Sequence, residues 1–179
     1  MNDSLAGKIR KLHLAGMLQT ADMRAGQAVK ENMSYLEFLE ILVNDENMNR
    51  SRNRRADLMR QSRFPQHKTI EEFNFSWQPC LNKQAVYALG TCEFIRKKEN
   101  IAFIGLPGTG KTHLSISLGI KAIDQGYSVL FTTLSEMMDD LYMSRADNSF
   151  RQKLKKYVSP NLLIIDEFGL KRLNQTNVD

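Results

Sequence analysis

The chain has 179 residues, of which 25 are Lys or Arg and 20 are Asp or Glu, so its formal net charge is +5. Hydrophobic residues make up 42% and charged residues 25%, which are ordinary values for a globular protein and exclude a wholly disordered or collagen-like chain. No apolar run approaches the roughly 20 residues that a membrane span needs. We therefore expect one or two small domains and no membrane partner.

Two further features predict a cytoplasmic protein. The first residues include Asp3, Lys8 and Arg10 instead of an apolar segment, so we expect no secretory signal. Cys80 and Cys92 form no CxxC motif and lack a histidine cluster, which argues against a disulfide framework or a zinc site. We expect both cysteines to be buried thiols in a reducing compartment.

The first 65 residues predict a small helical domain. Apolar residues recur early at helical spacing: Leu5, Ile9 and Leu12. Ser34 and Glu37 form a capping box that starts a second helix. The apolar residues at 35–43 are expected to be buried against neighbouring helices. The helical pattern ends by Pro65, because proline lacks an amide hydrogen.

The positive charge is concentrated in one stretch. Residues 50–68 contain seven Lys or Arg and one acid, giving +6, whereas residues 31–49 contain five acids and no Lys or Arg. The candidate nucleic-acid contacts are Arg50, Arg52, Arg54, Arg55, Arg60 and Arg63. Arginine suits phosphate because its planar fork donates two hydrogen bonds at once. The alternative is a solvated helix face that pairs with the preceding acidic turns.

Residues 66–80 are expected to be a linker, with a short capped turn between Thr69 and Glu72. Its alternating aromatic residues are Phe73, Phe75 and Trp77. We expect these rings to pack on the following domain, and stacking on nucleic-acid bases is the alternative.

Residues 81–179 predict an α/β domain. The expected helices are 81–92, 113–125, 136–143 and 150–157, and the expected strands are 101–104, 129–133 and 162–165. Gly126 is expected to end a helix in the left-handed region, and Ser135 is expected to cap the next one. The order strand, helix, strand, helices, strand is typical of a parallel sheet.

A phosphate-binding loop follows the first of these strands. The pattern GxxxxGK[ST] is formed by Gly105, Leu106, Pro107, Gly108, Thr109, Gly110, Lys111 and Thr112, with His113 next to it. The glycines let backbone amides approach phosphate oxygens closely, and the helix that follows adds its positive dipole end. Lys111 is expected to reach the β- and γ-phosphates, and the Thr112 hydroxyl to coordinate Mg²⁺. The three histidines are interpreted as structural.

An acidic pair completes the predicted site. Four apolar residues, 162–165, precede Asp166 and Glu167, which places both acids at the carboxyl end of a buried strand. Ligands bind at that edge of an open α/β sheet. Asp166 is expected to hold Mg²⁺, and Glu167 to act as general base on the attacking water.

Three segments together resemble the IstB-like ATPases, insertion-sequence helper proteins that are AAA+ relatives of the DnaC helicase loader. The segments are FIGLPGTGKTHLSISLG at 103–119, GYSVLFTT at 126–133 and LLIIDEFG at 162–169. Two upstream segments, YLEFLEILVNDE at 35–46 and FNFSWQP at 73–79, also resemble this family, so the resemblance covers residues 5 to 170. It implies an ATP- and Mg²⁺-dependent DNA-binding protein that oligomerises at full length and assists a transposase. The alternatives are a DnaC-like helicase loader, a small-molecule kinase and a remnant that does not turn over ATP.

The resemblance also implies an incomplete sheet. Members of the family continue with a further core strand carrying a polar sensor residue, an arginine finger and a helical C-terminal part. Only twelve residues follow Glu167, and 173–179 show no helix or strand pattern. We therefore expect a truncated AAA+-type P-loop domain that binds ATP but hydrolyses it poorly, because a missing arginine finger costs about 10³–10⁵ in rate.

Overall fold

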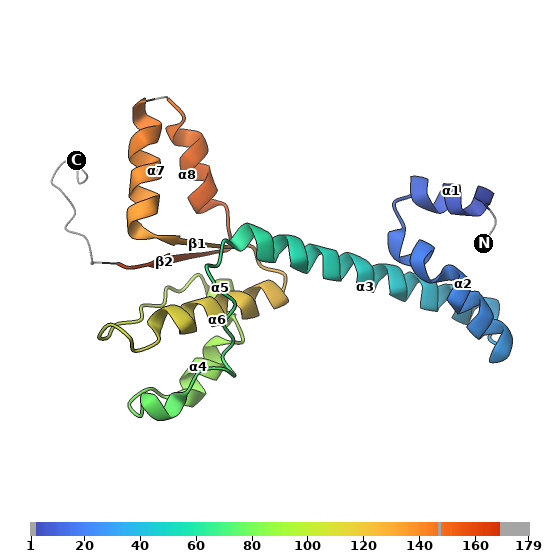
Figure 1. The fold of residues 1–179 in the computed structure, drawn as a ribbon, viewed down its shortest axis with the longest axis horizontal. Coiled ribbons are helices and arrows are strands. Elements are labelled where there is room, and N and C mark those ends of the chain that lie inside the picture. Colours follow the sequence, from blue (N-terminus) through green and yellow to red (C-terminus); the bar gives the residue numbers. More distant parts are fainter. Residues whose placement is uncertain (1–2, 147, 169–179) are drawn as a thin grey trace. The chain divides into compact units, whose positions relative to one another are not determined.

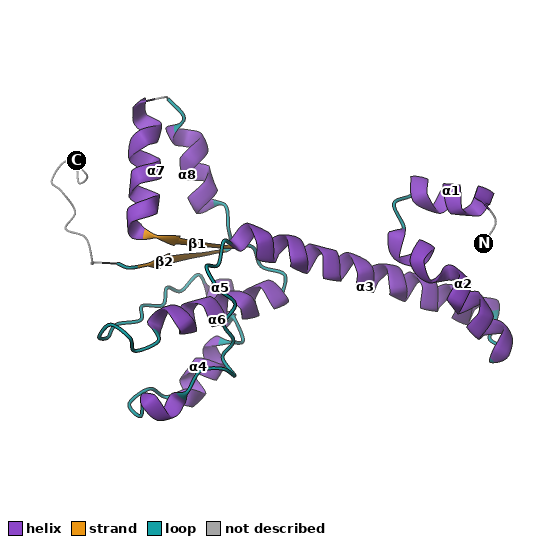
Figure 2. Ribbon diagram, viewed as in Figure 1, coloured by secondary structure: helices purple, strands orange, loops and turns teal. Residues whose placement is uncertain are grey.

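The structure, a computed structural model, describes residues 3–146 and 148–168. The chain forms two compact units, Met1–Ala56 and Asp57–Asp179, each described here by itself. In chain order the elements are α1 (Asp3–Lys11), α2 (Ala15–Lys30), α3 (Tyr35–Ser62), the short 3₁₀ helix η1 (Phe75–Trp77), α4 (Lys83–Leu89), α5 (Glu93–Lys97), α6 (Lys111–Asp124), β1 (Val129–Thr133), α7 (Leu134–Ala146), α8 (Phe150–Val158) and β2 (Leu162–Asp166) (Figures 1 and 2). The predicted domain boundaries at residues 65 and 80 stay a prediction. The segment 173–179 lies outside the described residues.

The first unit is helical, as predicted, and the expected capping box starts α3. The Ser34 amide donates to Glu37 Oε2 at 2.7 Å, and the Glu37 amide donates to Ser34 Oγ at 3.3 Å. No helix among the described residues has both the length and the apolar character that a membrane crossing requires.

The contact between α2 and α3 centres on a buried acid. Glu46, 4% exposed, accepts from the Gly16 amide at 2.7 Å and the Met17 amide at 3.2 Å, which satisfies two free donors at the start of α2. A Cβ at position 16 would lie 2.8 Å from Asp45 O and from Glu46 Cα, so glycine allows the two helices to approach this closely. Arg24 pairs with Asp45 at 2.8 Å and lowers the pKa of that carboxyl.

The prediction that the start of α3 is buried is wrong. Tyr35 is 95% exposed, Leu36 78% and Leu39 52%. The reason is that α3 meets α2 through polar residues further along, Asp45 and Glu46, rather than through its first apolar turns.

The second unit contains a parallel sheet, as predicted. β1 pairs with β2 in the register Val129 with Leu162 through Thr133 with Asp166, and the sheet has two strands in the described part of the chain. α6 packs on both strands (Figure 1). The contact is close at Gly119, where a Cβ would meet Phe64 Cζ at 2.6 Å and Ile164 Cδ1 at 2.8 Å. This helix-on-sheet core holds the end of β2 near the start of α6.

The expected strand at 101–104 is absent from the structure. The segment runs without regular structure, and Ile104 is 95% exposed. A strand forms only when a neighbour exchanges backbone hydrogen bonds with it, and the β1–β2 sheet does not extend to this segment. The prediction of a strand at 101–104 is therefore wrong.

Two other expectations about helices are corrected. The helix predicted at 81–92 is shorter in the structure, where α4 ends at Leu89; a separate helix, α5, begins at Glu93 after Cys92, which takes a left-handed φ of 58°. α7 begins before Ser135, because the cap is a capping box of Thr133 and Glu136, with reciprocal amide to side-chain bonds of 3.2 Å. Gly126 ends α6 with a φ of 86°, as predicted.

The two cysteines differ. Cys92 is buried, as predicted, and burial raises the pKa of its thiol. Cys80 is exposed, so the expectation of two buried thiols is wrong for this residue.

Candidate functional site

The phosphate loop forms the tight turn that its sequence predicts. Gly108 and Gly110 take φ angles of 78° and 86°, which side chains with a Cβ rarely adopt. α6 begins directly after this turn at Lys111, so its free backbone amides face the loop. The Thr109 hydroxyl donates to Leu106 O at 2.8 Å and closes the turn. Leu106 itself is 77% exposed, which leaves the tip of the loop open.

Lys111 lies across the loop. Its Nζ donates to Gly105 O at 2.9 Å and to Leu106 O at 2.8 Å. Both acceptors are carbonyl groups of the loop, so the ammonium stands within the turn that would surround a phosphate chain. Phosphate oxygens would be stronger partners for this cation than neutral carbonyls, because both charges then contribute.

The two halves of the predicted site meet. The Thr112 hydroxyl donates to Asp166 Oδ2 at 2.8 Å, although the residues are 54 positions apart. A hydroxyl oxygen and a carboxylate oxygen are the hard ligands that Mg²⁺ prefers, and it uses few protein ligands beside phosphate oxygens and water. The residues present therefore fit the predicted metal site.

Glu167 occupies the turn that follows β2. Its φ is 56°, a left-handed conformation that costs a residue with a Cβ about 1–2 kcal/mol. The Glu167 side chain is exposed and, together with Asp166, lines a cavity of about 710 Å³.

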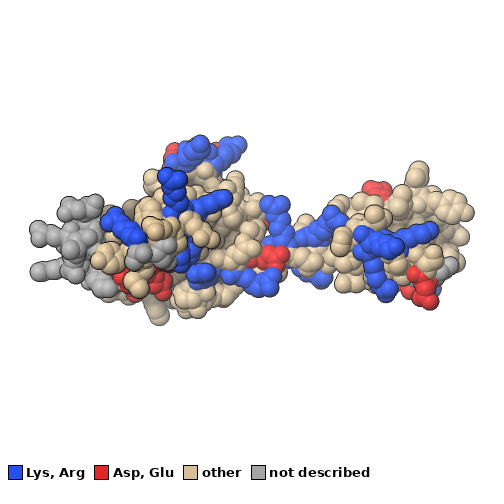
Figure 3. All heavy atoms as spheres, turned by 90° about the horizontal axis from the view of Figure 1, so that it is seen from above, with Lys and Arg blue, Asp and Glu red and all other residues tan. Residues whose placement is uncertain are grey.

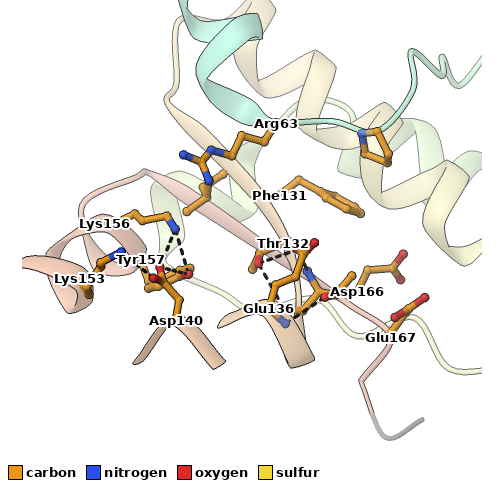
Figure 4. Close-up of a pocket in the computed structure, with 13 residues that line it drawn as sticks. Arg63, Phe131, Thr132, Glu136, Asp140, Lys153, Lys156, Tyr157, Asp166 and Glu167 are labelled. Carbon is orange, nitrogen blue, oxygen red and sulfur yellow. Dashed lines mark hydrogen bonds and ion pairs between the residues drawn. The ribbon is translucent and has the colours of Figure 1, made fainter. Parts of the chain in front are cut away.

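The opposite wall of this cavity holds a cluster of four residues that sequence analysis missed (Figure 4). Asp140 on α7 accepts hydrogen bonds from Lys153, Lys156 and the Tyr157 hydroxyl, all on α8, at 2.7, 2.7 and 2.8 Å. The donors lower the pKa of Asp140 far below its usual range, Lys153 most of all. Burial raises the pKa of Tyr157. The cluster joins α7 to α8, and an i, i+3 spacing of lysines on α8 was the only sequence signal for it.

Replacing Asp140 by Asn is expected to destabilise the protein by about 1 kcal/mol at pH 7, because three hydrogen bonds to a charged group are weakened in a partly exposed site. The folded pKa is depressed, so the stabilisation is present above the unfolded pKa of about 3.9 and is lost as pH falls further. Urea unfolding at pH 7 and at stepwise lower pH measures the free energy of unfolding. The difference in this free energy between wild type and Asp140→Asn should disappear in acid. Asp139→Asn, on the same helix, should show a smaller difference from wild type. An equal gap at all pH values would contradict this.

His113 contacts the linker. Its Nε2 lies 2.7 Å from Thr69 O, and its ring packs edge-on against Phe73 at 5.3 Å between centroids. Phe73 also covers the loop, since a Cβ at Gly110 would lie 2.4 Å from Phe73 Cε2. The structural interpretation of His113 agrees with these contacts. The expectation that the linker aromatics pack on this domain is confirmed for Phe73 and Phe75 and is wrong for Trp77, which is 79% exposed. The sequence did not predict the contact of Phe73 with Gly110.

The candidate arginines are exposed, but they do not form one stripe. Successive helical residues are about 100° apart, so Arg50 and Arg54 share one side of α3 while Arg52 and Arg55 lie on another. Lys and Arg side chains are prominent along α3 in Figure 3. Arg50 pairs with Glu46 at 2.6 Å and lowers the pKa of that carboxyl.

Other arginines of this set also have partners within the chain. Arg52 donates to the Asn49 amide oxygen at 3.0 Å, and Arg60 pairs with Asp57. Arg63 follows α3 and lines the cavity beside Lys156 (Figure 4). The acid-paired arginines, Arg50 and Arg60, agree with the alternative of a solvated helix face. Arg52, Arg54 and Arg55 stay predicted contacts with nucleic acid.

Comparison with known proteins gives consistent matches. The family described as IstB-like ATP binding protein matches residues 7–179. The chain is 36% identical over 174 residues to a protein of insertion sequence IS5376 from Geobacillus stearothermophilus, covering 97% of this chain and 69% of the relative. It is 35% identical over 149 residues to a protein of insertion sequence IS21 from Pseudomonas aeruginosa, covering 83% and 56%.

A third relative belongs to insertion sequence IS232 of Bacillus thuringiensis subsp. berliner and is 33% identical over 165 residues, covering 92% of this chain and 66% of the relative. All three relatives are named as ATP-binding proteins. The matched region thus spans between 56% and 69% of the lengths of these three relatives.

Proposed function

The chain belongs to the family of IstB-like ATP binding proteins, and from this premise we propose that it binds Mg-ATP at the phosphate loop and assists DNA transposition. In this proposal the chain contacts DNA through the arginines of α3 and supports the transposase of the same insertion sequence in an ATP-dependent way. It forms homo-oligomers, as the resemblance to the full-length family implies.

The hydrogen bond between Thr112 and Asp166 is the observation that carries the nucleotide part of this proposal. Gly-rich turns occur in many proteins without a ligand, but this turn is joined to an acid at the carboxyl end of a parallel strand. That edge is where open α/β sheets bind their ligands. The juxtaposition supplies phosphate-binding amides, a cation and hard oxygen ligands within one site.

Each residue then has a chemical task. The backbone amides of the loop and of the start of α6 bind phosphate oxygens, and Lys111 exchanges its carbonyl partners for the β- and γ-phosphates. Thr112 and Asp166 would hold Mg²⁺, which would supply positive charge to neutralise the phosphates. Glu167 orients and deprotonates a water molecule for attack on the γ-phosphate.

The role in transposition is supported by the relatives, which are named for insertion sequences. Those names favour a transposition helper over a DnaC-like helicase loader or a small-molecule kinase. The helical first unit with its exposed arginines also suits a protein that contacts a nucleic-acid backbone.

The metal site is tested by the magnesium dependence of ATP binding. Wild type should bind a fluorescent ATP analogue more tightly with Mg²⁺ than with EDTA, because the metal would neutralise phosphate charge at a site that offers it hard oxygen ligands. Thr112→Val and Asp166→Asn should each lose about 10-fold in affinity with Mg²⁺ and little with EDTA. Asp139→Asn is the matched control, since it removes an exposed acid on α7. Equal Mg²⁺ dependence in wild type and both variants would reject the site.

A further inference from the structure

A short segment of the linker lies against the phosphate loop. We call residues 69–73 the strap. The strap is well anchored: Thr69 and Glu72 form a capping box, with the Thr69 amide donating to Glu72 Oε2 at 2.8 Å, and the Ile70 side chain is 1% exposed. Its apolar residues belong to a core cluster with Val86, Leu114 and Leu118, of which the last two lie on α6.

Phe73 is the strap residue that touches the loop itself. Its ring occupies the space that a side chain at Gly110 would need, with Phe73 Cε2 only 2.4 Å from the position of such a Cβ. Gly110 precedes Lys111 and holds the left-handed φ that directs the chain into α6. The ring therefore restricts the backbone at the point where the loop becomes helix. The Phe75 ring packs against the Phe73 ring in a T-shaped contact, with 4.9 Å between the centroids.

His113 connects the first turn of α6 to the other end of the strap. A carbonyl oxygen only accepts hydrogen bonds, so the 2.7 Å contact between His113 Nε2 and Thr69 O requires a proton on Nε2. The same imidazole ring packs edge-on against Phe73. One turn further on, Ser117 donates to His113 O at 2.7 Å. Lys121 pairs with Glu71 of the strap at 2.9 Å.

We propose that the strap positions the phosphate loop for nucleotide, with Phe73 and His113 as positioning residues. Neither side chain is required to touch the nucleotide. Phe73 limits the backbone at Gly110, and His113 ties the start of α6 to the strap, so that the amides around Lys111 are already arranged when phosphate arrives. The inference rests on the proposed function in that the ligand of the loop is ATP.

How rigidly the phosphate loop is held can be measured without any nucleotide, by hydrogen exchange of its backbone amides. Hydrogen exchange of the amides at 105–112 is compared in wild type, Phe73→Leu, His113→Ala and His113→Gln. Phe73→Leu keeps an apolar side chain but removes the ring, and His113→Gln keeps a side-chain donor. The control is Phe94→Leu, which alters a buried phenylalanine in the other core cluster of the same unit, away from the loop.

The result expected is faster exchange at 105–112 in Phe73→Leu and His113→Ala, with recovery in His113→Gln and no local change in Phe94→Leu. The affinity for Mg-ATP and for tripolyphosphate, which tests phosphate binding alone, should fall about 3- to 10-fold in Phe73→Leu and His113→Ala, because a loop that is not arranged in advance binds its ligand more weakly. Unchanged exchange and tripolyphosphate affinity in both variants would overturn the inference. If wild type fails to bind ATP, the proposed function fails, while the exchange pattern still decides the role of the strap.

Discussion

Replacing Lys111 by alanine is expected to abolish measurable binding of a fluorescent ATP analogue, with a loss of at least about 100-fold in affinity. The ammonium already lies within the loop, bonded to Gly105 O and Leu106 O at 2.9 and 2.8 Å. A bound nucleotide would replace these carbonyls by charged phosphate oxygens. Each hydrogen bond to a charged group contributes about 1.5–3 kcal/mol, so the loss of two accounts for this magnitude.

The fold should tolerate this change, because Lys111 makes its contacts with the loop and not with the core. The melting temperature of the Lys111→Ala variant is expected to remain near that of wild type. Lys97→Ala, which removes an exposed lysine of α5, is the matched control and should bind the analogue normally. Wild-type affinity in Lys111→Ala, with the fold intact, would show that phosphates bind elsewhere.

The second large effect is expected in the salt dependence of DNA binding. Replacing Arg52, Arg54 and Arg55 together by alanine should reduce the slope of log K against log salt by about 2–3, since each phosphate contact contributes about 0.9 on duplex DNA. At low salt the affinity should fall by roughly 10²-fold, and the loss should be similar on unrelated sequences, because backbone contacts do not identify bases. Fluorescence anisotropy with a labelled duplex at several salt concentrations measures both quantities.

The control for this experiment removes the same charge from other helices of the first unit. Lys8, Lys11 and Lys30 lie exposed on α1 and α2, and their joint replacement by alanine also lowers the net charge by three. A general charge effect would change both triple variants equally. The proposed interface requires a larger change in slope for the arginine variant. An unaltered slope in that variant would place the DNA contact elsewhere.

Local chemistry explains which features could be predicted from the sequence. Capping boxes need only residues three apart, so Ser34 with Glu37 and Thr69 with Glu72 were identified correctly. β1, β2 and α6 are dense apolar segments with clear ends, and their predicted bounds agree with the structure within about two residues. The phosphate loop was predictable because its left-handed turns require glycine at fixed positions.

Features that depend on a distant partner could not be predicted. The segment 101–104 has the composition of a strand, but strand formation depends on a neighbour in the sheet. The start of α3 looks like a buried helix, yet the contact with α2 forms at Glu46 instead. The Asp140 cluster and the contact of Phe73 with Gly110 join residues 13 to 37 positions apart, and no spacing rule indicates such pairs.

The sequence by itself determined which residue types make up the site: a glycine-rich turn, a lysine and two acids at a strand end. Only the tertiary structure decided that Thr112 and Asp166 meet, that Phe73 and His113 connect the linker to the loop, and which arginines pair with acids. The physical reason is the distance along the chain over which each effect acts. Backbone preferences act over a few residues, whereas side-chain contacts depend on where packing brings distant segments together.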